Sequence, residues 1–440
     1  MQRSRAMLPA LAFLQAAVAC SSSTHSTSVP SDGGTTLDTA TDGAGNSSGG
    51  SGTSASSSGS GSGGFSGGSS GGSSGSSTSG GSSDGSSGSS DGMPGKVSRP
   101  IYSTGNGFFT LNGDIYDANG NQFIPMGVDT AHWDQSWAGC TSNCGISNSG
   151  ANINRDFMYE LESSYTSRIQ GDITEMVNQK IVPLETGAFY TTGSSPTGTS
   201  CCTDTTCLDD VVALWVSMYS VFAPYQQYIW INIANEWGPA NSSTWATAYE
   251  SAITMLRNAG YTCPLVIDSG GCGQDPYDFI EYGKEVFDSD PQKNVIFSIH
   301  IYGNWTPTGT WSPTYTGSPV PLAGGLQALA TAGASGGFPV MAGEFGPGLG
   351  EGPSPTSITP LSIMQEADAL GMGWLAWAWD DGSPFNLTST AGDGQFLLTN
   401  GQPTNGAYPN NTDLSAYGNT VVLAPTYGLF YSAKPASVFP

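Results

Sequence analysis

Eight short apolar runs, separated by longer segments, constrain the fold of this 440-residue chain more than any other feature. Each run is rich in β-branched, aromatic and aliphatic residues, as expected of a parallel strand that is buried on both faces. The runs comprise residues 123–129, 151–155, 181–185, 228–234, 265–268, 294–300, 338–344 and 373–379.

Helical patterns lie between most of these runs, and a last one follows the eighth run. They comprise residues 169–178, 209–222, 244–259, 326–332, 363–370 and 413–423. We expect Asp209 and Asp210 to cap the second of these helices and Gly260 to end the third. Strands and helices in alternation predict an α/β protein, and eight such strands predict a closed (β/α)8 TIM barrel. The alternative is an open doubly wound sheet, but its Gly-rich phosphate turn is missing after the early strands.

The chain before the barrel divides into a leader and a linker. Residues 1–20 combine Arg3 and Arg5 with an apolar stretch too short to span a bilayer, which is typical of a secretory signal peptide. The leader ends in Ala-Val-Ala-Cys, which fits either cleavage or a lipobox in which Cys20 carries a lipid. Residues 21–96 consist mainly of Ser, Gly and Thr and predict a disordered, flexible tether.

The remaining residues, 97–440, suit one catalytic domain of barrel size. Two short strands within residues 107–120 are expected to form an N-terminal β-cap on this barrel. We expect the domain to be a monomer.

The charge of the chain limits its partners. The formal net charge is −24, with only 11 Lys and Arg residues. Such acidity argues against nucleic acid and anionic membranes as partners, so membrane contact is expected only through a lipid on Cys20. A neutral substrate is compatible with this charge, and so is acidity that serves solubility alone.

The eight cysteines indicate disulfides, because the leader predicts an extracellular location. Zinc is the alternative, but the chain has only three His and no Cys-x-x-Cys pair. Cys263 and Cys272 flank the fifth strand, which separates them by more than the roughly 7 Å that a disulfide tolerates. We therefore predict that Cys263 is an unpaired thiol. The other six cysteines after the leader would form three disulfides, with different partners for the adjacent Cys201 and Cys202.

Polar and aromatic residues gather at the C-terminal ends of the predicted strands. In a parallel barrel these ends form one rim, which is where active sites lie. The rim residues are His132 and Trp133 after the first strand, Arg155 at the second, Asn235, Glu236 and Trp237 after the fourth, His300 and Tyr302 at the sixth, Glu344 at the seventh and Trp377 at the eighth.

Glu236 and Glu344 are the residues that a glycosidase requires. One carboxyl group must donate a proton to the leaving oxygen while the other attacks the sugar, and aromatic rings stack on sugar faces. Taken singly, each residue has a structural explanation, such as a salt bridge for Glu236 or a core position for Trp377. Their presence on the same rim favours a site that cleaves sugars.

The motifs of this chain resemble glycoside hydrolase family 5, and specifically its subfamily 8 of bacterial endo-β-1,4-mannanases. The resemblance covers most of the chain after the tether, and Asn235-Glu236-Trp237 is its most specific part. Other matching segments are residues 111–127, 256–260, 273–276, 286–291, 293–302, 343–346, 373–379 and 434–439.

The resemblance implies roles for the rim residues. It implies Glu236 as acid/base, Glu344 as nucleophile and Asn235 as the donor to the sugar 2-hydroxyl, with Tyr302 positioning Glu344. It further implies that His300 and Arg155 support the site, that Trp377 forms the floor of the subsite for the cleaved sugar, and that His132, Trp133 and Trp237 bind substrate. It implies a retaining mechanism with carboxyl groups about 5 Å apart, without metal or organic cofactor.

The chain departs from the family in two places. Residues 184–193 lack the His-Asp pair that usually ends the third strand, and Asn154 stands before Arg155 where the family prefers Val. The primary hypothesis is an endo-acting β-mannanase that cleaves mannan, glucomannan or galactomannan. An endo-β-1,4-glucanase and a non-catalytic glycan-binding surface protein are the alternatives. All three would act outside the cell, secreted or tethered to its surface.

Overall fold

The computed structural model describes residues 96–130, 145–158, 166–187, 202–317, 319–347, 358–380, 385–389 and 394–439. The predictions for the leader, for nearly all of the linker, and for His132, Trp133, Cys140, Cys144 and Cys201 therefore concern residues outside this described part.

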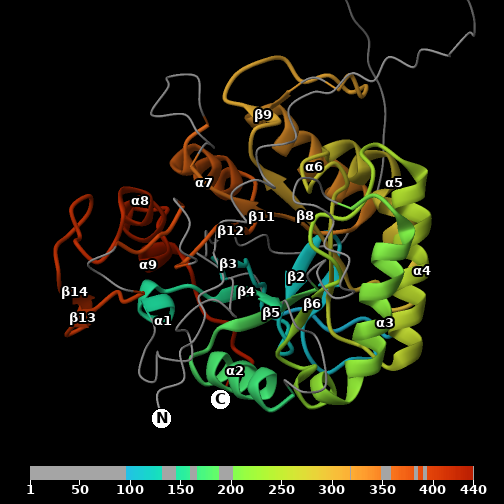
Figure 1. The fold of residues 1–440 in the computed structure, drawn as a ribbon, viewed down its shortest axis with the longest axis horizontal. Coiled ribbons are helices and arrows are strands. Elements are labelled where there is room, and N and C mark those ends of the chain that lie inside the picture. Colours follow the sequence, from blue (N-terminus) through green and yellow to red (C-terminus); the bar gives the residue numbers. More distant parts are fainter. Residues whose placement is uncertain are drawn as a thin grey trace, which may run out of the picture. The chain divides into compact units, whose positions relative to one another are not determined.

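Eight parallel strands close a barrel, as the sequence predicts (Figure 1). Around the barrel they follow in the order β11-β12-β3-β4-β5-β6-β7-β8, so each strand pairs with its neighbour in the chain and the last pairs with the first. The strands are β3 (Met126–Thr130), β4 (Ile153–Met158), β5 (Val182–Gly187), β6 (Trp230–Asn232), β7 (Leu265–Asp268), β8 (Val295–Ile301), β11 (Val340–Phe345) and β12 (Trp374–Ala376).

Helices surround this barrel (Figure 1). The main ones are α2 (Thr166–Asn178), α3 (Thr205–Phe222), α4 (Ser243–Ala259), α5 (Pro276–Ser289), α6 (Leu322–Gly336), α7 (Pro360–Ala369) and α8 (Ala416–Leu423). The smaller elements are β1 (Phe109–Leu111), β2 (Asp114–Tyr116), α1 (Gly145–Ser149), the 3-10 helix η5 (Ala223–Tyr225), β9 (Trp305–Thr306), β10 (Val320–Pro321), β13 (Leu398–Thr399), β14 (Gln402–Pro403) and α9 (Leu429–Ser432).

One helix begins at a different residue than predicted, one helix was not predicted, and one predicted helix end is confirmed. Helix α3 begins earlier than expected, because Asp204 is its N-cap and accepts from the Thr206 amide, so Asp209 and Asp210 lie inside the helix. Helix α5 was not predicted, although Asp275 caps it and Pro276 occupies its first turn. Helix α4 does end at Gly260, whose φ of 110° is left-handed and favours glycine.

The predicted N-terminal cap is present and closes the end of the barrel opposite the rim. Strands β1 and β2 form an antiparallel pair. Next to them, Phe108 and Phe123 pack edge-on against Trp230 of β6, with ring centroids 5.5 and 5.8 Å from that of the Trp. The apolar surface that these rings remove from water stabilises the closed end of the barrel.

Indole groups from two helices fix the rim ends of neighbouring strands. Trp215 of α3 donates from Nε1 to the Ile233 carbonyl at 2.9 Å. Trp245 of α4 donates in the same way to the Asp268 carbonyl at 3.1 Å. Both side chains are completely buried, so these hydrogen bonds are shielded from water. They fix the C-terminal ends of β6 and β7, next to Glu236.

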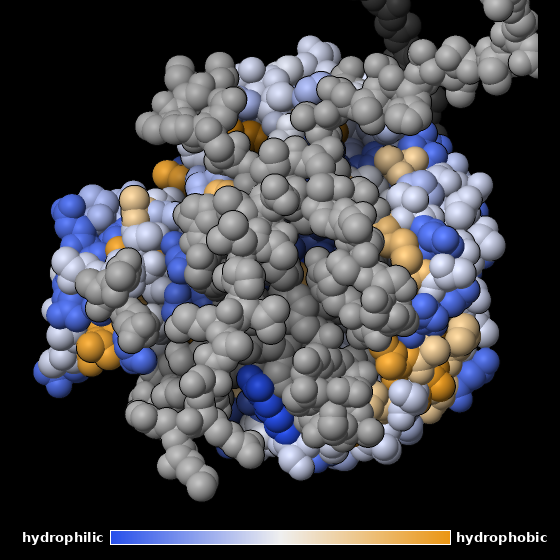
Figure 2. Space-filling view, viewed as in Figure 1, coloured by the Kyte–Doolittle hydropathy of each residue, from blue (hydrophilic) through white to orange (hydrophobic). Residues whose placement is uncertain are grey.

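Helix α3 belongs to the ring of helices. Residues Thr205–Tyr225 are long and apolar enough to cross a membrane by length and composition alone. However, the helix buries one face, which includes Val211, Val212 and Trp215, in the core of the domain. Its outer face contributes to an apolar patch over α3 and α4 on an otherwise mostly hydrophilic described surface, where Val216 and Met255 are exposed (Figure 2).

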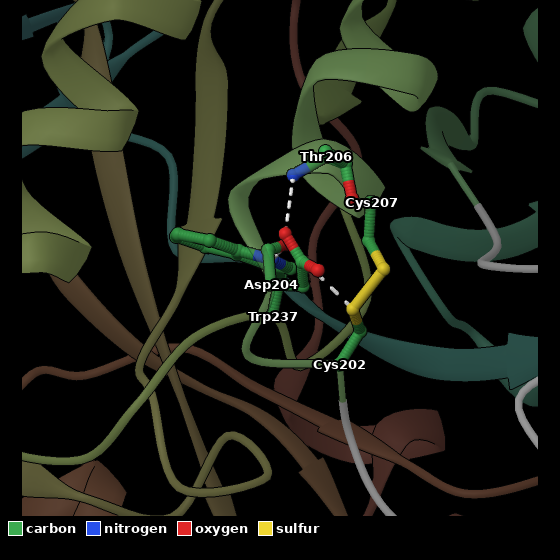
Figure 3. Close-up of a disulfide and its surroundings, with 5 residues drawn as sticks. All are labelled: Cys202, Asp204, Thr206, Cys207 and Trp237. Carbon is green, nitrogen blue, oxygen red and sulfur yellow. Dashed lines mark hydrogen bonds between the residues drawn. A yellow bond between two sulfur atoms is a disulfide. The ribbon is translucent and has the colours of Figure 1, made fainter.

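The described cysteines agree with the prediction for Cys263, which is free and buried. Cys272 is disulfide-bonded, and Cys202 is joined to Cys207 with an S–S distance of 2.02 Å. The latter bond also means that Cys202 does not pair with its neighbour Cys201. This disulfide joins Cys202 to Cys207 in the first turn of α3, beside the Trp237 side chain (Figure 3).

Replacing Arg257 with Ala should lower the free energy of unfolding by about 3–5 kcal/mol, because it leaves the buried Asp290 carboxylate without its partner. Arg257 lies in the last turn of α4, and its guanidinium makes two hydrogen bonds to the Asp290 carboxylate, at 3.0 and 2.7 Å. The matched control is Lys284→Ala, which removes an exposed pair with Asp288 and should cost less than about 1 kcal/mol. Urea unfolding measures both, and equal losses would contradict the prediction.

Cys263 should react with iodoacetamide only after the protein is unfolded. Burial raises the pKa of its thiol to about 12 and hides its sulfur, so neither thiolate nor access is available in the native state. Peptide mass spectrometry after labelling without reductant, with and without urea, measures this. Labelling of Cys263 in the native protein at pH 8 would refute the prediction.

Candidate active site

The barrel brings the described rim residues together around two carboxyl groups. Glu236 follows β6, and Glu344 lies near the end of β11, which β7 and β8 separate from β6 in the closed sheet order. His300 of β8 contacts both, with Nδ1 lying 2.9 Å from Glu236 Oε1 and 3.6 Å from Glu344 Oε2. Oxygen atoms of the two carboxyl groups lie within 4.8 Å of each other. This is the close spacing that a retaining glycosidase requires.

Arg155 of β4 is the cation that organises the site. Its side chain is completely buried. Its Nη1 donates to Glu344 Oε2 at 2.8 Å, and its Nη2 forms an ion pair with Asp268 at 3.1 Å. Asn232 accepts from two of its nitrogens, at 3.2 and 2.9 Å. A guanidinium surrounded in this way fixes the position of the Glu344 carboxylate.

The contact between Arg155 and Asn235 orients the Asn235 amide. Arg155 Nη2 donates to Asn235 Oδ1 at 2.6 Å. Because a guanidinium can only donate, the acceptor must be the carbonyl oxygen of the amide. The amide nitrogen is thereby directed away from Arg155 and is the atom through which Asn235 can donate to a substrate hydroxyl.

Tyr302 binds the second oxygen of Glu344. Its hydroxyl donates to Glu344 Oε1 at 2.7 Å. Burial and the neighbouring carboxylate raise the pKa of Tyr302 well above its usual value, so the phenol keeps its proton and remains a donor. Arg155 and Tyr302 together therefore hold both oxygens of Glu344.

Glu236 has the properties of a proton donor. Burial raises its pKa above the usual value for a Glu, and the Glu344 charge adds to this effect. The side chain is 20% exposed, whereas that of Glu344 is 10% exposed. A carboxyl group that is largely buried but reachable from one side can hold a proton and release it to a bound ligand.

Asp268, at the end of β7, is a site residue that the sequence reasoning missed. Its Oδ2 accepts from the Glu236 amide at 3.0 Å, and its Oδ1 lies 3.5 Å from His300 Nε2. Burial alone would raise its pKa, but the charges of His300 and Arg155 lower it to about 2. Asp268 is thus an anion at every ordinary pH.

Asp129, at the end of β3, is a second carboxyl group that was missed. It is completely buried and lies 3.5 Å from Arg155 Nη1. Burial raises its pKa well above the usual range, which makes it a neutral acid beside the charged groups. Both missed residues end predicted strands, so the rule that located Glu236 and Glu344 would also have found Asp129 and Asp268.

The two aromatic residues predicted at this rim occupy different environments. Trp377 is partly exposed and packs edge-on against Phe157, with ring centroids 5.0 Å apart. Trp237, predicted to bind substrate, is instead completely buried. Its indole donates to the Asp204 carbonyl at 2.8 Å, and its ring packs against Tyr249 of α4 (Figure 3). The prediction for Trp237 therefore needs correction, because a buried indole cannot contact a sugar.

The two departures from the family lie at well-packed positions. Asn154 points away from the cleft, since its amide donates to Thr130 and contacts Met176 of α2. The end of β5 has no room for an additional side chain at Gly187. A Cβ there would lie 2.7 Å from the Ile233 carbonyl oxygen and 2.9 Å from Trp215 Nε1. The described end of this strand therefore cannot hold a His in place of Gly187.

Glu236, His300 and Glu344 are close enough to one another to be considered as metal ligands. Their surroundings fit that use poorly. Both oxygens of Glu344 already accept hydrogen bonds from Arg155 and Tyr302. Burial alone would lower the pKa of His300, but Asp268 and Glu344 raise it to about 10, so both ring nitrogens carry protons and neither can bind a metal.

Two carboxyl groups close to each other and a partly exposed Trp on a barrel rim are the arrangement of a glycoside hydrolase. The comparisons with known proteins agree. Residues 191–383 match the cellulase family (glycosyl hydrolase family 5). A mannan endo-1,4-β-mannosidase from Salipaludibacillus agaradhaerens is 30% identical over 284 residues, which are 63% of this chain and 82% of that protein. The chain belongs to glycosyl hydrolase family 5.

Two further relatives extend the likeness over more of the chain. A mannan endo-1,4-β-mannosidase from Streptomyces lividans is 28% identical over 342 residues, which are 76% of this chain and 78% of that protein. The structure of the mannotriose complex of a β-mannanase from Thermomonospora fusca has a TM-score of 0.56 at 26% identity, covering 76% of this chain and 100% of that one. The likeness therefore includes the whole barrel of the solved protein.

Replacing Tyr302 with Phe should lower kcat/KM for glycan hydrolysis by about 10- to 100-fold, because a hydrogen bond to a charged group contributes about 1.5–3 kcal/mol. The matched control is Tyr277→Phe, which removes a hydroxyl that donates to the Ser312 carbonyl instead of to Glu344. Initial rates with a soluble polysaccharide measure both variants. Equal effects of the two substitutions would contradict a specific contribution of the Tyr302 hydroxyl.

Proposed function

We propose that this protein is an endo-acting β-mannanase that hydrolyses β-1,4-mannosidic bonds with retention of configuration. The observation that carries the proposal is the pairing of Glu236 and Glu344, whose oxygens lie within 4.8 Å in one hydrogen-bonded site. Inverting enzymes need a wider separation, about 6.5–9.5 Å, to place a water molecule between the sugar and the base.

In the first step Glu344 attacks the anomeric carbon and forms a glycosyl–enzyme ester. The bond from that carbon to the leaving oxygen breaks, and Glu236 gives its proton to this oxygen. The raised pKa of Glu236 keeps the required proton on it towards neutral pH. Arg155 and Tyr302 hold Glu344 in the attacking position.

In the second step Glu236, now ionised, takes a proton from water. The resulting hydroxide equivalent attacks the anomeric carbon, the bond to Glu344 breaks, and Glu344 leaves as a carboxylate. The enzyme returns to its starting protonation state, and the product keeps the β configuration. Every proton in the cycle moves through Glu236.

Mannan is supported as the substrate by the relatives, several of which are named mannan endo-1,4-β-mannosidase. In this proposal Asn235 donates to the sugar 2-hydroxyl, the group whose axial position distinguishes mannose from glucose. Trp377 stacks on the sugar that is cleaved. The mannotriose complex of the Thermomonospora fusca enzyme supports an oligosaccharide-binding cleft in the same fold.

An endo-β-1,4-glucanase is the second candidate, because the matching family description is that of a cellulase. The catalytic groups are the same for both substrates. A non-catalytic glycan-binding protein is disfavoured, since binding alone does not require a raised pKa on Glu236 beside a fully hydrogen-bonded Glu344.

The site of action that we propose is outside the cell, where the enzyme works as a monomer. The leader at residues 1–20 and the disulfide between Cys202 and Cys207 support export. The Ser/Gly-rich tether of residues 21–96 would then separate the catalytic domain from a lipid on Cys20, or remain as a free extension after cleavage.

Glu344→Gln should abolish hydrolysis of mannan, and Glu236→Gln should lower kcat by about 10²–10⁴-fold, because a positioned acid/base contributes that much. Sodium azide should restore turnover of an activated aryl mannoside in Glu236→Ala and give a β-mannosyl azide, because azide replaces the water that needs a base. The matched control is Glu285→Gln in α5, an exposed position that should keep full activity.

Reducing-sugar release from mannan, glucomannan and carboxymethylcellulose distinguishes the candidate functions. Release from mannan and glucomannan supports the mannanase. Release from carboxymethylcellulose alone would replace it by the glucanase. If Glu236→Gln and Glu344→Gln both kept wild-type activity, the assignment of the active site would fail.

A further inference from the structure

Asp268, the last residue of β7, contacts the residues that surround the Glu236 carboxyl group. Its carboxyl group is completely buried and lies against three parts of the site at once. It accepts the Glu236 amide at 3.0 Å, pairs with Arg155 Nη2 at 3.1 Å and lies 3.5 Å from His300 Nε2. Asn232 donates to its other oxygen at 3.2 Å.

The first of these contacts holds a strained backbone. Glu236 has a φ of 53°, in the left-handed region that residues with a side chain rarely adopt. The chain turns there from β6 into the rim, and the turn decides where the Glu236 side chain points. The ionised Asp268 accepts the amide of this same residue, which is a charge-assisted hydrogen bond strong enough to offset the strain.

The contact with His300 acts through the imidazole ring. The His300 ring lies between Asp268 on its Nε2 side and Glu236 on its Nδ1 side. The buried anion on one side stabilises the imidazolium form of the ring, as a buried carboxylate does for its partner. The imidazolium then donates from Nδ1 to Glu236 Oε1 at 2.9 Å. This hydrogen bond fixes the orientation of the Glu236 carboxyl group through Oε1.

We propose that Asp268 is a positioning residue for the general acid, because it holds the Glu236 backbone and the His300 ring that together orient the Glu236 carboxyl group. The inference rests on the proposed glycosidase function and deepens it. Asp268 itself touches neither substrate nor reacting atoms, and it acts through the backbone amide and through His300. Arg155 keeps its bonds to Glu344, Asn232 and Asn235 without Asp268, so the nucleophile depends on Asp268 less than the acid does.

The test compares two leaving groups in the purified full-length Asp268→Asn variant. Phenyl β-mannotrioside needs a proton on its leaving oxygen, whereas 2,4-dinitrophenyl β-mannotrioside does not, and kcat/KM for both reports the first step alone. We expect kcat/KM to fall by about 10²-fold or more for the phenyl substrate and by less than about tenfold for the dinitrophenyl substrate. A loss of equal size on both substrates would overturn the proposal, because it would indicate general structural damage.

The matched control is Asp290→Asn, which also removes a buried carboxylate paired with an arginine, Arg257, at the opposite end of β8 from the site. It should lower the free energy of unfolding without changing the ratio of the two kcat/KM values. If Asp290→Asn changes this ratio as Asp268→Asn does, the ratio does not report acid positioning and the proposal fails.

His300→Gln keeps the proposal testable if Asp268→Asn does not fold. The Gln amide can still donate to Glu236, but it carries no charge for Asp268 to stabilise. We expect the same dependence on the leaving group, in a smaller degree because the backbone bond from Glu236 to Asp268 remains. Equal losses on both substrates would contradict the His300 arm of the proposal. Failure of the wild-type protein to cleave either mannoside would instead overturn the proposed function.

Discussion

The buried Arg155 guanidinium at the mouth of the barrel determines how the surrounding polar side chains are arranged. A buried charge without partners costs several kcal/mol, so the completely buried Arg155 is tolerable only where neighbouring strands supply acceptors. Here β4 provides the cation, β6 provides Asn232, β7 provides Asp268 and β11 provides Glu344. The acceptors that satisfy Arg155 stabilise the mouth of the barrel, and one of them is the Glu344 carboxylate, whose position is fixed by the same contact.

The same balance of charge explains why four carboxyl groups in one cluster behave differently. Within the described part of the chain, the cations that face them are Arg155 and His300, so mutual repulsion and burial favour the neutral form of some of these acids. The pKa of Asp268 is lowered because it touches both cations, whereas the pKa values of Glu236 and Asp129 are raised by burial. Environment thus separates a proton donor from a permanent anion among side chains of nearly the same chemistry.

Sequence reasoning was most successful where the information is local. The eight strands, the β-cap and the C-terminal end of α4 follow from residue pattern and turn chemistry, and all are present. It failed where packing decided the outcome. Trp237 follows a catalytic motif yet turns into the core to bond the Asp204 carbonyl. Helix α5 was not predicted, although its start signal, Asp275 followed by Pro276, is present in the sequence.

By itself the sequence determined the order of strands and helices and the identity of the two glutamates, because periodicity and strand-end polarity are properties of short segments. Only the tertiary structure decided that Glu236 and Glu344, more than a hundred residues apart, place oxygens within 4.8 Å of each other. Closure of the barrel and the register between strands set that distance. Closure also brought Asp268 beneath Glu236 and His300, a contact among three strand ends that no local pattern encodes.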